Sequence, residues 1–210
     1  MELLLVGASG LVGQQVLQQA LANPGVSRVV APTRRPLLPA PGLDNPIVDF
    51  ERLPADAPWW KVDAVICTLG TTMAQAGSKA AFRRVDRDYP LAVARLARAA
   101  GARAFVLNSA LAAAADSRVF YNRVKGEAEN AIAALGYPSL TLVRPSLLDG
   151  GPRRDSRPGE RIGLAFARML RPLIPARFRA VATDAVARAL LAAALAQAPG
   201  VQILESERIA

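Results

Sequence analysis

Short apolar runs alternate with longer amphipathic stretches along most of this 210-residue chain. The runs predicted to form buried strands are "ELLLVG", "SRVVAP", "VDAVICTLG", "ARAFVLNSA", "SLTLVRPS" and "VQILES", and a further short strand is expected within "NPIVDF". Near-continuous apolar strands separated by helices are typical of parallel sheets covered on both faces. The pattern therefore predicts an α/β fold, a Rossmann-type doubly wound parallel sheet.

Amphipathic helices fit between these strands. In the first, Val12, Val16 and Ala20 form one apolar stripe and a set of glutamines takes the opposite side. The others are expected from about Pro90 to Gly101, from Tyr121 to Leu135, and from Thr183 to Ala198 with Thr183 as N-cap. We expect one domain over residues 1–210, with a small C-terminal substrate-side lobe at about 147–180.

The amino-acid composition excludes several kinds of catalytic and metal-binding site. The chain has no histidine and a single cysteine, Cys67, which excludes a Ser-His-Asp triad, a Cys-His dyad, a disulfide framework and multi-cysteine metal sites, so no metal is expected. The net charge of +9 admits nucleic acid as a partner, but the arginines are spread without interleaved aromatic residues, so we do not expect it. No secretory signal or membrane span is recognised, and the expected location is cytoplasmic.

A glycine-rich turn, "GASGLVG", follows the first predicted strand and opens the first helix. Gly7, Gly10 and Gly13 allow a tight turn, a close backbone approach to a pyrophosphate, and close packing of the helix on the strand. The helix N-terminus offers free N–H groups and a positive dipole end to phosphates. This arrangement predicts a dinucleotide site, although the same spacing also occurs in ordinary turns.

The end of the second strand bears on which dinucleotide binds. An acidic residue there would hold the ribose 2′-hydroxyl of NAD, but the sequence reads "APTRRP". Arg34 and Arg35 are suited to a 2′-phosphate, which favours NADP(H) over NAD(H). The alternative is two ordinary surface arginines in an arginine-rich chain.

Two further loops are expected at the carboxyl edge of the sheet, where such folds bind their cofactor. Asp49 and Phe50 would cover the adenine, and the segment from Leu69 through Gly70 and Thr71 to Thr72 would line the ribose and diphosphate. Either loop can equally be a plain turn.

Only three of the 26 basic residues are lysines, at positions 61, 79 and 125, and Lys125 follows Tyr121 by four residues. At that spacing on a helix the two side chains share one face. A cation beside a phenol favours the phenolate, so a tyrosine paired in this way can exchange a proton with a carbonyl oxygen. The hydroxyl of Ser109, just past a predicted strand, would hold the substrate oxygen. A buried tyrosine beside a solvated lysine is the competing interpretation.

These motifs together resemble the short-chain dehydrogenase/reductases in their atypical, extended-like form, in the branch of the Tat-interacting protein oxidoreductase and its small bacterial relatives. The resemblance spans most of the chain, through "CTLGTT", "FRRVDRDYPLAVARLA", "YNRVKGEAE", "LVRPSLLDG" and "DSRPGER". It implies Tyr121 and Lys125 as the active-site pair, with Ser109 at the family's serine position. The cofactor contacts that it implies are Gly7, Ser9, Gly10, Leu11, Val12 and Gly13 at the phosphates, Arg34 and Arg35 at the 2′-phosphate, Leu69 and Gly70 at a ribose, and Arg144, Pro145 and Ser146 near the nicotinamide.

Two functions of different classes follow. The first is an NADPH-dependent reductase of a small carbonyl or sugar-like compound. The second is a catalytically weak regulatory protein that senses NADPH, suggested by the short C-terminal lobe. Arg153, Arg154, Arg157 and Arg161 would attract an anionic substrate, although solvated surface charge is the favoured interpretation. Nothing in the sequence specifies an oligomer interface.

Overall fold

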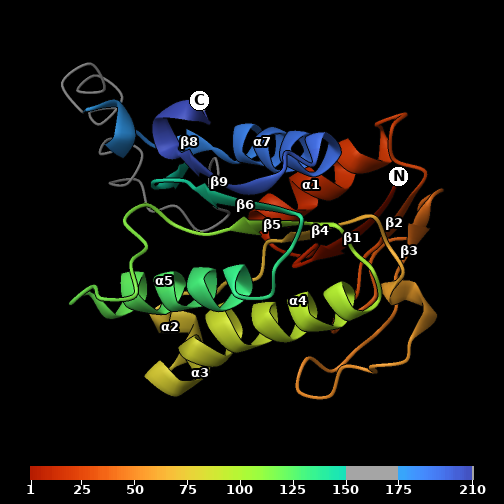
Figure 1. Ribbon diagram of the computed structural model, residues 1–210, viewed down its shortest axis with the longest axis horizontal. Coiled ribbons are helices and arrows are strands. Elements are labelled where there is room, and N and C mark those ends of the chain that lie inside the picture. Colours follow the sequence, from red (N-terminus) through yellow and green to blue (C-terminus); the bar gives the residue numbers. More distant parts are fainter. Residues whose placement is uncertain (150–174, 210) are drawn as a thin grey trace, which may run out of the picture.

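A seven-stranded parallel sheet runs through the centre of the computed structural model, which describes residues 1–149 and 175–209 (Figure 1). Its strand order is β3-β2-β1-β4-β5-β6-β9. The strands are β1 (Glu2–Val6), β2 (Arg28–Val30), β3 (Leu43–Asp44), β4 (Ala64–Cys67), β5 (Ala104–Asn108), β6 (Ser139–Arg144) and β9 (Gly200–Glu205). The order reverses at β1, which pairs with β2 on one side and β4 on the other. This topology confirms the predicted Rossmann-type sheet.

Helices cover both faces of the sheet. On one face lie α1 (Leu11–Leu21) and α7 (Thr183–Ala196), and on the other lie α4 (Tyr89–Ala99) and α5 (Phe120–Ala133) (Figure 1). Successive β1 side chains alternate between the two cores: Leu3 and Leu5 pack with α1 and α7, and Leu4 and Val6 pack on the opposite side. Burial on both sides explains why the strands read as continuous apolar runs.

The connection between β4 and α4 is more elaborate than the sequence pattern predicted. It contains α2 (Met73–Ala76), α3 (Lys79–Arg83) and a π-helical turn at Arg84–Asp88 that leads directly into α4. The side chains of Thr72 and Ser78 accept hydrogen bonds from backbone N–H groups in α2 and α3, so both short helices are N-capped. Turns of four or five residues are too short to show a hydrophobic period, and the sequence pattern therefore predicts no helix between Thr72 and Pro90.

Several boundaries differ from those predicted. The short strand expected in "NPIVDF" lies slightly earlier, at β3, and only an isolated bridge joins Ile47 to Thr33. The N-cap of α7 is Ala182 rather than Thr183, and it makes no side-chain capping bond. Helix α7 ends at Ala196, where Gln197 adopts the left-handed conformation. Apolar periodicity continues past the true end of a helix, so it locates boundaries poorly.

The C-terminal part also contains a two-stranded pair of β7 (Leu148–Asp149) and β8 (Val181–Ala182). Short 3₁₀ turns lie at Pro58–Trp60, Ala176–Phe178 and Ser206–Arg208. Most of the predicted substrate-side lobe, including Arg153, Arg154, Arg157 and Arg161, lies outside the described residues.

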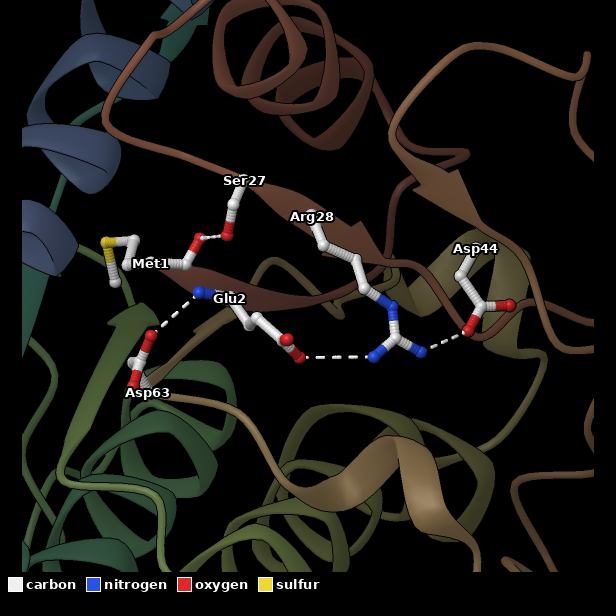
Figure 2. A network of polar contacts seen from close by, with 6 residues as sticks. All are labelled: Met1, Glu2, Ser27, Arg28, Asp44 and Asp63. Atoms are coloured by element: carbon white, nitrogen blue, oxygen red, sulfur yellow. Dashed lines mark hydrogen bonds and ion pairs between the residues drawn. The ribbon is translucent and has the colours of Figure 1, made fainter.

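Charged side chains join the first three strands at the edge of the sheet where β1 and β2 begin (Figure 2). The Arg28 guanidinium on β2 lies 3.1 Å from Glu2 on β1 and 2.6 Å from Asp44 on β3. The Glu2 backbone N–H donates to Asp63, immediately before β4, at 2.7 Å. These contacts fix neighbouring strands at the edge opposite the loops that carry the predicted cofactor residues.

Candidate active site

The glycine loop joins the carboxyl end of β1 to α1 in a very close packing. Gly7 has φ +88°, a conformation that favours glycine. A Cβ on Gly13 would lie 2.1 Å from the Gly7 carbonyl oxygen, so the helix can approach the strand this closely only with glycine there. Gly10 is the N-cap, with no side-chain cap and no acidic residue in the first turn. The positive end of α1 is therefore not neutralised by its own first turn.

The loop after β4 lies directly beside the glycine loop. A Cβ on Gly7 would come within 2.8 Å of the Leu69 backbone nitrogen, and the Thr68 hydroxyl donates to the Val6 carbonyl oxygen at 3.0 Å. The predicted cofactor loops at Gly7 to Gly13 and Leu69 to Thr71 thus form one continuous surface at the carboxyl edge of β1 and β4.

Lys125 reaches this same surface from α5. Its side chain is 6% exposed, and its ammonium lies 2.8 Å from Oδ1 of Asp86, a carboxylate on the π-helical turn. Oδ2 of Asp86 accepts a hydrogen bond from the Thr71 backbone N–H at 2.9 Å. A Cβ on Gly70 would lie 3.7 Å from the Lys125 nitrogen, which places this ammonium beside the β4 loop.

The charge of Lys125 is set by opposing effects. Burial lowers its pKa, but the negative charges of Asp86 and of the Tyr121 phenolate outweigh burial, and the pKa is raised above its ordinary value. The competing interpretation expected a solvated lysine. That expectation is wrong, because Lys125 is buried and paired with Asp86. Asp86 was not singled out from the sequence, because nothing in its spacing links it to Lys125 thirty-nine positions later.

Tyr121 lies at the beginning of α5 with 37% of its surface exposed, so it is not a buried core tyrosine. Its ring packs against the fully buried Phe82 of α3, with ring centroids 5.6 Å apart. Phe82 also contacts Phe120 at 5.7 Å. The short helix α3 thereby holds one side of the phenol while the other remains open.

Ser109 follows β5 and is 5% exposed. Its Oγ has no hydrogen-bond partner within the described part of the chain, and neither does Oδ1 of Asn108. A buried hydroxyl without a partner is costly, so its presence indicates a group that a ligand or water satisfies. Backbone bonds from Ser109 to Val143 and from Leu111 to Pro145 attach this segment to the end of β6.

The residues predicted near the nicotinamide lie at the end of β6 and directly after it, and two of them bond to other parts of the protein. The Arg144 guanidinium donates to both carboxylate oxygens of Glu129, at 3.0 and 2.5 Å, and to Glu205 at 3.1 Å. Ser146 donates from its hydroxyl to the Arg179 carbonyl and from its backbone N–H to Ser206. These two side chains therefore anchor the end of the sheet, and Pro145 between them is buried.

The residues predicted to contact the adenine and the 2′-phosphate differ in their exposure to solvent. Arg34 and Arg35 are exposed, and neither forms an ion pair with any residue that the structure describes. Thr33 fixes their backbone by donating from its hydroxyl to the Arg35 carbonyl at 2.6 Å. Asp49 is exposed, whereas Phe50 is 8% exposed and packs on Tyr89, with ring centroids 5.7 Å apart. Phe50 is thus mainly a core residue.

Over the described ranges, 1–149 and 175–209, no group of three or more His, Cys, Asp or Glu side chains is arranged to hold a metal ion. Within the same ranges, no helix combines the length and apolar character needed to cross a membrane.

The fold and the glycine loop define a Rossmann-type protein. Sequence comparison identifies the family to which it belongs. The chain is 36% identical to protein HTATIP2 of Rattus norvegicus over 211 residues, covering 98% of this chain and 86% of that protein. It is 34% identical to the mitochondrial protein fmp52 of Emericella nidulans over 173 residues, covering 78% of this chain and 73% of that protein. The chain therefore belongs to the family of HTATIP2 and fmp52, in the atypical short-chain dehydrogenase/reductases. No family model matches the sequence.

Solved structures with low sequence identity share the fold. MoeE5 in complex with UDP-glucuronic acid and NAD has a TM-score of 0.73 at 19% identity, covering 98% of this chain and 76% of that one. Human epimerase family protein SDR39U1 with NADPH has a TM-score of 0.61 at 20% identity, covering 98% and 74%.

The comparisons contradict the expected cellular location. The sequence was interpreted as cytoplasmic, but fmp52 relatives from several fungi, including Candida albicans and Eremothecium gossypii, are named as mitochondrial proteins. A family with mitochondrial members does not support a purely cytoplasmic assignment, which had rested on the missing secretory signal and the missing membrane span.

Proposed function

We propose that this protein is an NADP(H)-dependent reductase of a small carbonyl or sugar-like compound. The observation that carries the proposal is the continuous surface from the glycine loop through Leu69 and Gly70 to Lys125, with the partly open Tyr121 phenol on the same helix. MoeE5 in complex with NAD and human SDR39U1 with NADPH share this fold and support a nicotinamide cofactor.

The residues fit such a cofactor. The positive N-terminus of α1 and the glycine backbone would receive the diphosphate, and Gly70 leaves room for a ribose beside Lys125. Arg34 and Arg35, which are exposed and form no ion pair with a described residue, would bind the 2′-phosphate. When bound, the reduced nicotinamide supplies the hydride.

The chain itself would supply the proton. The Tyr121 hydroxyl would donate to the carbonyl oxygen, and the Lys125 ammonium would stabilise the phenolate that remains. The Ser109 hydroxyl, which is buried and has no hydrogen-bond partner among the described residues, would hold the same oxygen. Proton transfer of this kind contributes about 10²–10⁴-fold to a rate, so loss of the Tyr121 hydroxyl should be plain in turnover.

A fluorescence titration with NADPH and NADH tests the cofactor assignment. We expect tight NADPH binding, weaker NADH binding, and loss of the difference in the double variant Arg34→Ala/Arg35→Ala. Arg95→Ala/Arg103→Ala removes the same charge from two other exposed arginines and should keep the preference. Equal affinity for both nucleotides in the wild type would remove the claim of NADP(H) preference.

A screen of carbonyl compounds with NADPH tests catalysis. Tyr121→Phe should bind NADPH as the wild type does and lose turnover by at least about 10²-fold. Turnover that survives in Tyr121→Phe would remove the proton-donor role. If no carbonyl is reduced while NADPH binds tightly, the cofactor-sensing protein becomes the better description.

A further inference from the structure

Asp86 is a buried carboxylate in an unusual stretch of backbone. It is 2% exposed and lies at the centre of the π-helical turn Arg84–Asp88. The charged residues around it stay near the surface, where Arg84 pairs with Glu51 and Arg87 with Asp88. A π-turn adds a residue to the helical repeat and so changes which side chain faces inward, and such turns are frequent at functional sites.

The two oxygens of Asp86 connect two parts of the candidate site. Oδ1 lies 2.8 Å from the Lys125 ammonium of α5, and Oδ2 accepts the backbone N–H of Thr71 in the loop after β4 at 2.9 Å. Oδ1 has no hydrogen-bond donor other than Lys125 within the described residues. Gly70 lies beside this bridge, since a Cβ there would be in van der Waals contact with Oδ1 at 3.4 Å.

We infer that Asp86 is a positioning residue that holds the Lys125 ammonium charged and fixed beside Tyr121, and that ties this ammonium to the cofactor loop at Thr71. The inference rests on the proposed role of Lys125 in the reaction. Loss of this one carboxylate would release the loop from α5 and leave the lysine enclosed without a counterion.

The charges that face Lys125 explain why a carboxylate is needed. Besides Asp86, the titratable groups around the ammonium are Tyr121 on its own helix and Cys67 at the end of β4. Burial raises the pKa of the Cys67 thiol to about 12, so that thiol brings no negative charge at pH 7, and Asp86 is the carboxylate in direct contact with the ammonium. A buried lysine without a partner prefers the neutral form, and in that form it cannot stabilise a phenolate.

Nuclear magnetic resonance of the lysine side chains measures this directly, because the chain has only three lysines. In protein with labelled lysine, the side-chain signals are followed from pH 6 to 11 and assigned with Lys61→Arg and Lys79→Arg. The variant Asp86→Asn keeps one oxygen to accept the Thr71 N–H and replaces the charged oxygen opposite Lys125 with an uncharged amide NH2 group. Asp88→Asn, two residues along on the same turn and half-exposed, is the matched control.

In the wild type and in Asp88→Asn, the Lys125 signal should remain that of an ammonium beyond the ordinary lysine range near pH 10.4. In Asp86→Asn, its titration midpoint should fall by at least about two pH units, with the Lys61 and Lys79 signals unchanged. NADPH affinity of Asp86→Asn should weaken because the loop at Thr71 loses a charged anchor. An Asp86→Asn variant that is merely less stable, with the Lys125 midpoint unmoved, would overturn the inference.

Folding of the variant does not limit the test. If Asp86→Asn does not fold, the wild type alone decides, because a Lys125 that loses its proton below about pH 9 contradicts a charge held by Asp86. The lysine titration needs no nucleotide. A failed NADPH titration would therefore remove the proposed function and leave the Asp86–Lys125 result readable, whereas a failed lysine titration would remove this inference alone.

Discussion

Cys67 ends β4 with its thiol completely buried among the residues of the α4 and α5 side of the sheet. Burial raises its pKa from 9.0 to about 12, outweighing the neighbouring Leu69 N–H and Lys125, which lower it. In the unfolded chain the thiol ionises at lower pH. The native state therefore holds this proton more tightly, and the stability that the neutral thiol confers is complete below pH 9 and is lost as the pH rises toward 12.

This predicts a specific alkaline weakness. Between pH 8 and pH 10.5, the free energy of unfolding should lose up to about 2 kcal/mol through Cys67, at about 1.4 kcal/mol for each pH unit above its unfolded value. Urea unfolding of the wild type and Cys67→Ala at both pH values isolates the contribution of Cys67 to the free energy of unfolding. The advantage of the wild type over Cys67→Ala should shrink at pH 10.5. The same advantage at both pH values would show that the thiol is not protected as described.

At the scale of elements, the contact between α5 and the segment after β5 positions the proposed catalytic residues. Gly126 of α5 lies against the backbone of this segment: a Cβ there would come to 2.3 Å from both the Ala114 carbonyl carbon and the Ala115 nitrogen. The Ala114 N–H also donates to the Asn122 carbonyl at 3.1 Å. The segment from Ser109 and the helix of Tyr121 are thus held at a fixed separation by a glycine.

Replacement of Gly126 by alanine should therefore destabilise the protein, although alanine favours helices by about 1 kcal/mol over glycine. We expect a loss of about 1–3 kcal/mol, because backbone atoms must move to admit the methyl group. Asn130→Ala, on the exposed side of the same helix, should be neutral or slightly stabilising. Chemical denaturation measures the free energy of unfolding of both variants. A Gly126→Ala variant as stable as Asn130→Ala would contradict the packing described.

Helices and strands were predictable where hydrophobic residues recur with a regular period. The six strands with apolar runs and the helices α1, α4, α5 and α7 were expected from periodicity alone, and Gly7, Gly10 and Gly13 marked the turn between β1 and α1. The π-helical turn was not, because its residues "RVDRD" read as an ordinary charged helix surface. Asp86 lies buried on this turn, and the sequence carries no visible signal for the residue that a π-turn adds to the helical repeat.

The candidate site was predictable to a similar degree. The pattern located Tyr121, Lys125 and Ser109 by their places on a helix and after a strand, and whether they act as proposed stays a prediction. It did not show that Lys125 is buried against Asp86, or that Arg144 is bound by Glu129 and Glu205, because these partners come from distant elements. Pairings of this kind depend on tertiary structure, which spacing along the chain does not encode.

At the scale of the whole molecule, the proposed cofactor surface draws on loops after β1, β2, β4 and on helix α5, so a bound nucleotide would connect elements from both faces of the sheet. A ligand that binds only the folded state stabilises it by about 2.7 kcal/mol when its free concentration is one hundred times its Kd. For a domain of this size, each kcal/mol raises Tm by about 2–4 °C. NADPH at that concentration should thus raise Tm by about 5–10 °C.

NADH at the same concentration should raise Tm by clearly less, because its adenosine ribose has no 2′-phosphate for Arg34 and Arg35 to bind. Differential scanning fluorimetry compares the two nucleotides across the wild type, Arg34→Ala/Arg35→Ala and Arg95→Ala/Arg103→Ala. The first double variant should respond to both nucleotides alike, and the second should behave as the wild type. If both double variants reduced the NADPH response equally, the net charge of +9 rather than a built phosphate site would account for the preference. Raising the salt concentration would then abolish the preference, since long-range attraction is screened while a bidentate contact persists.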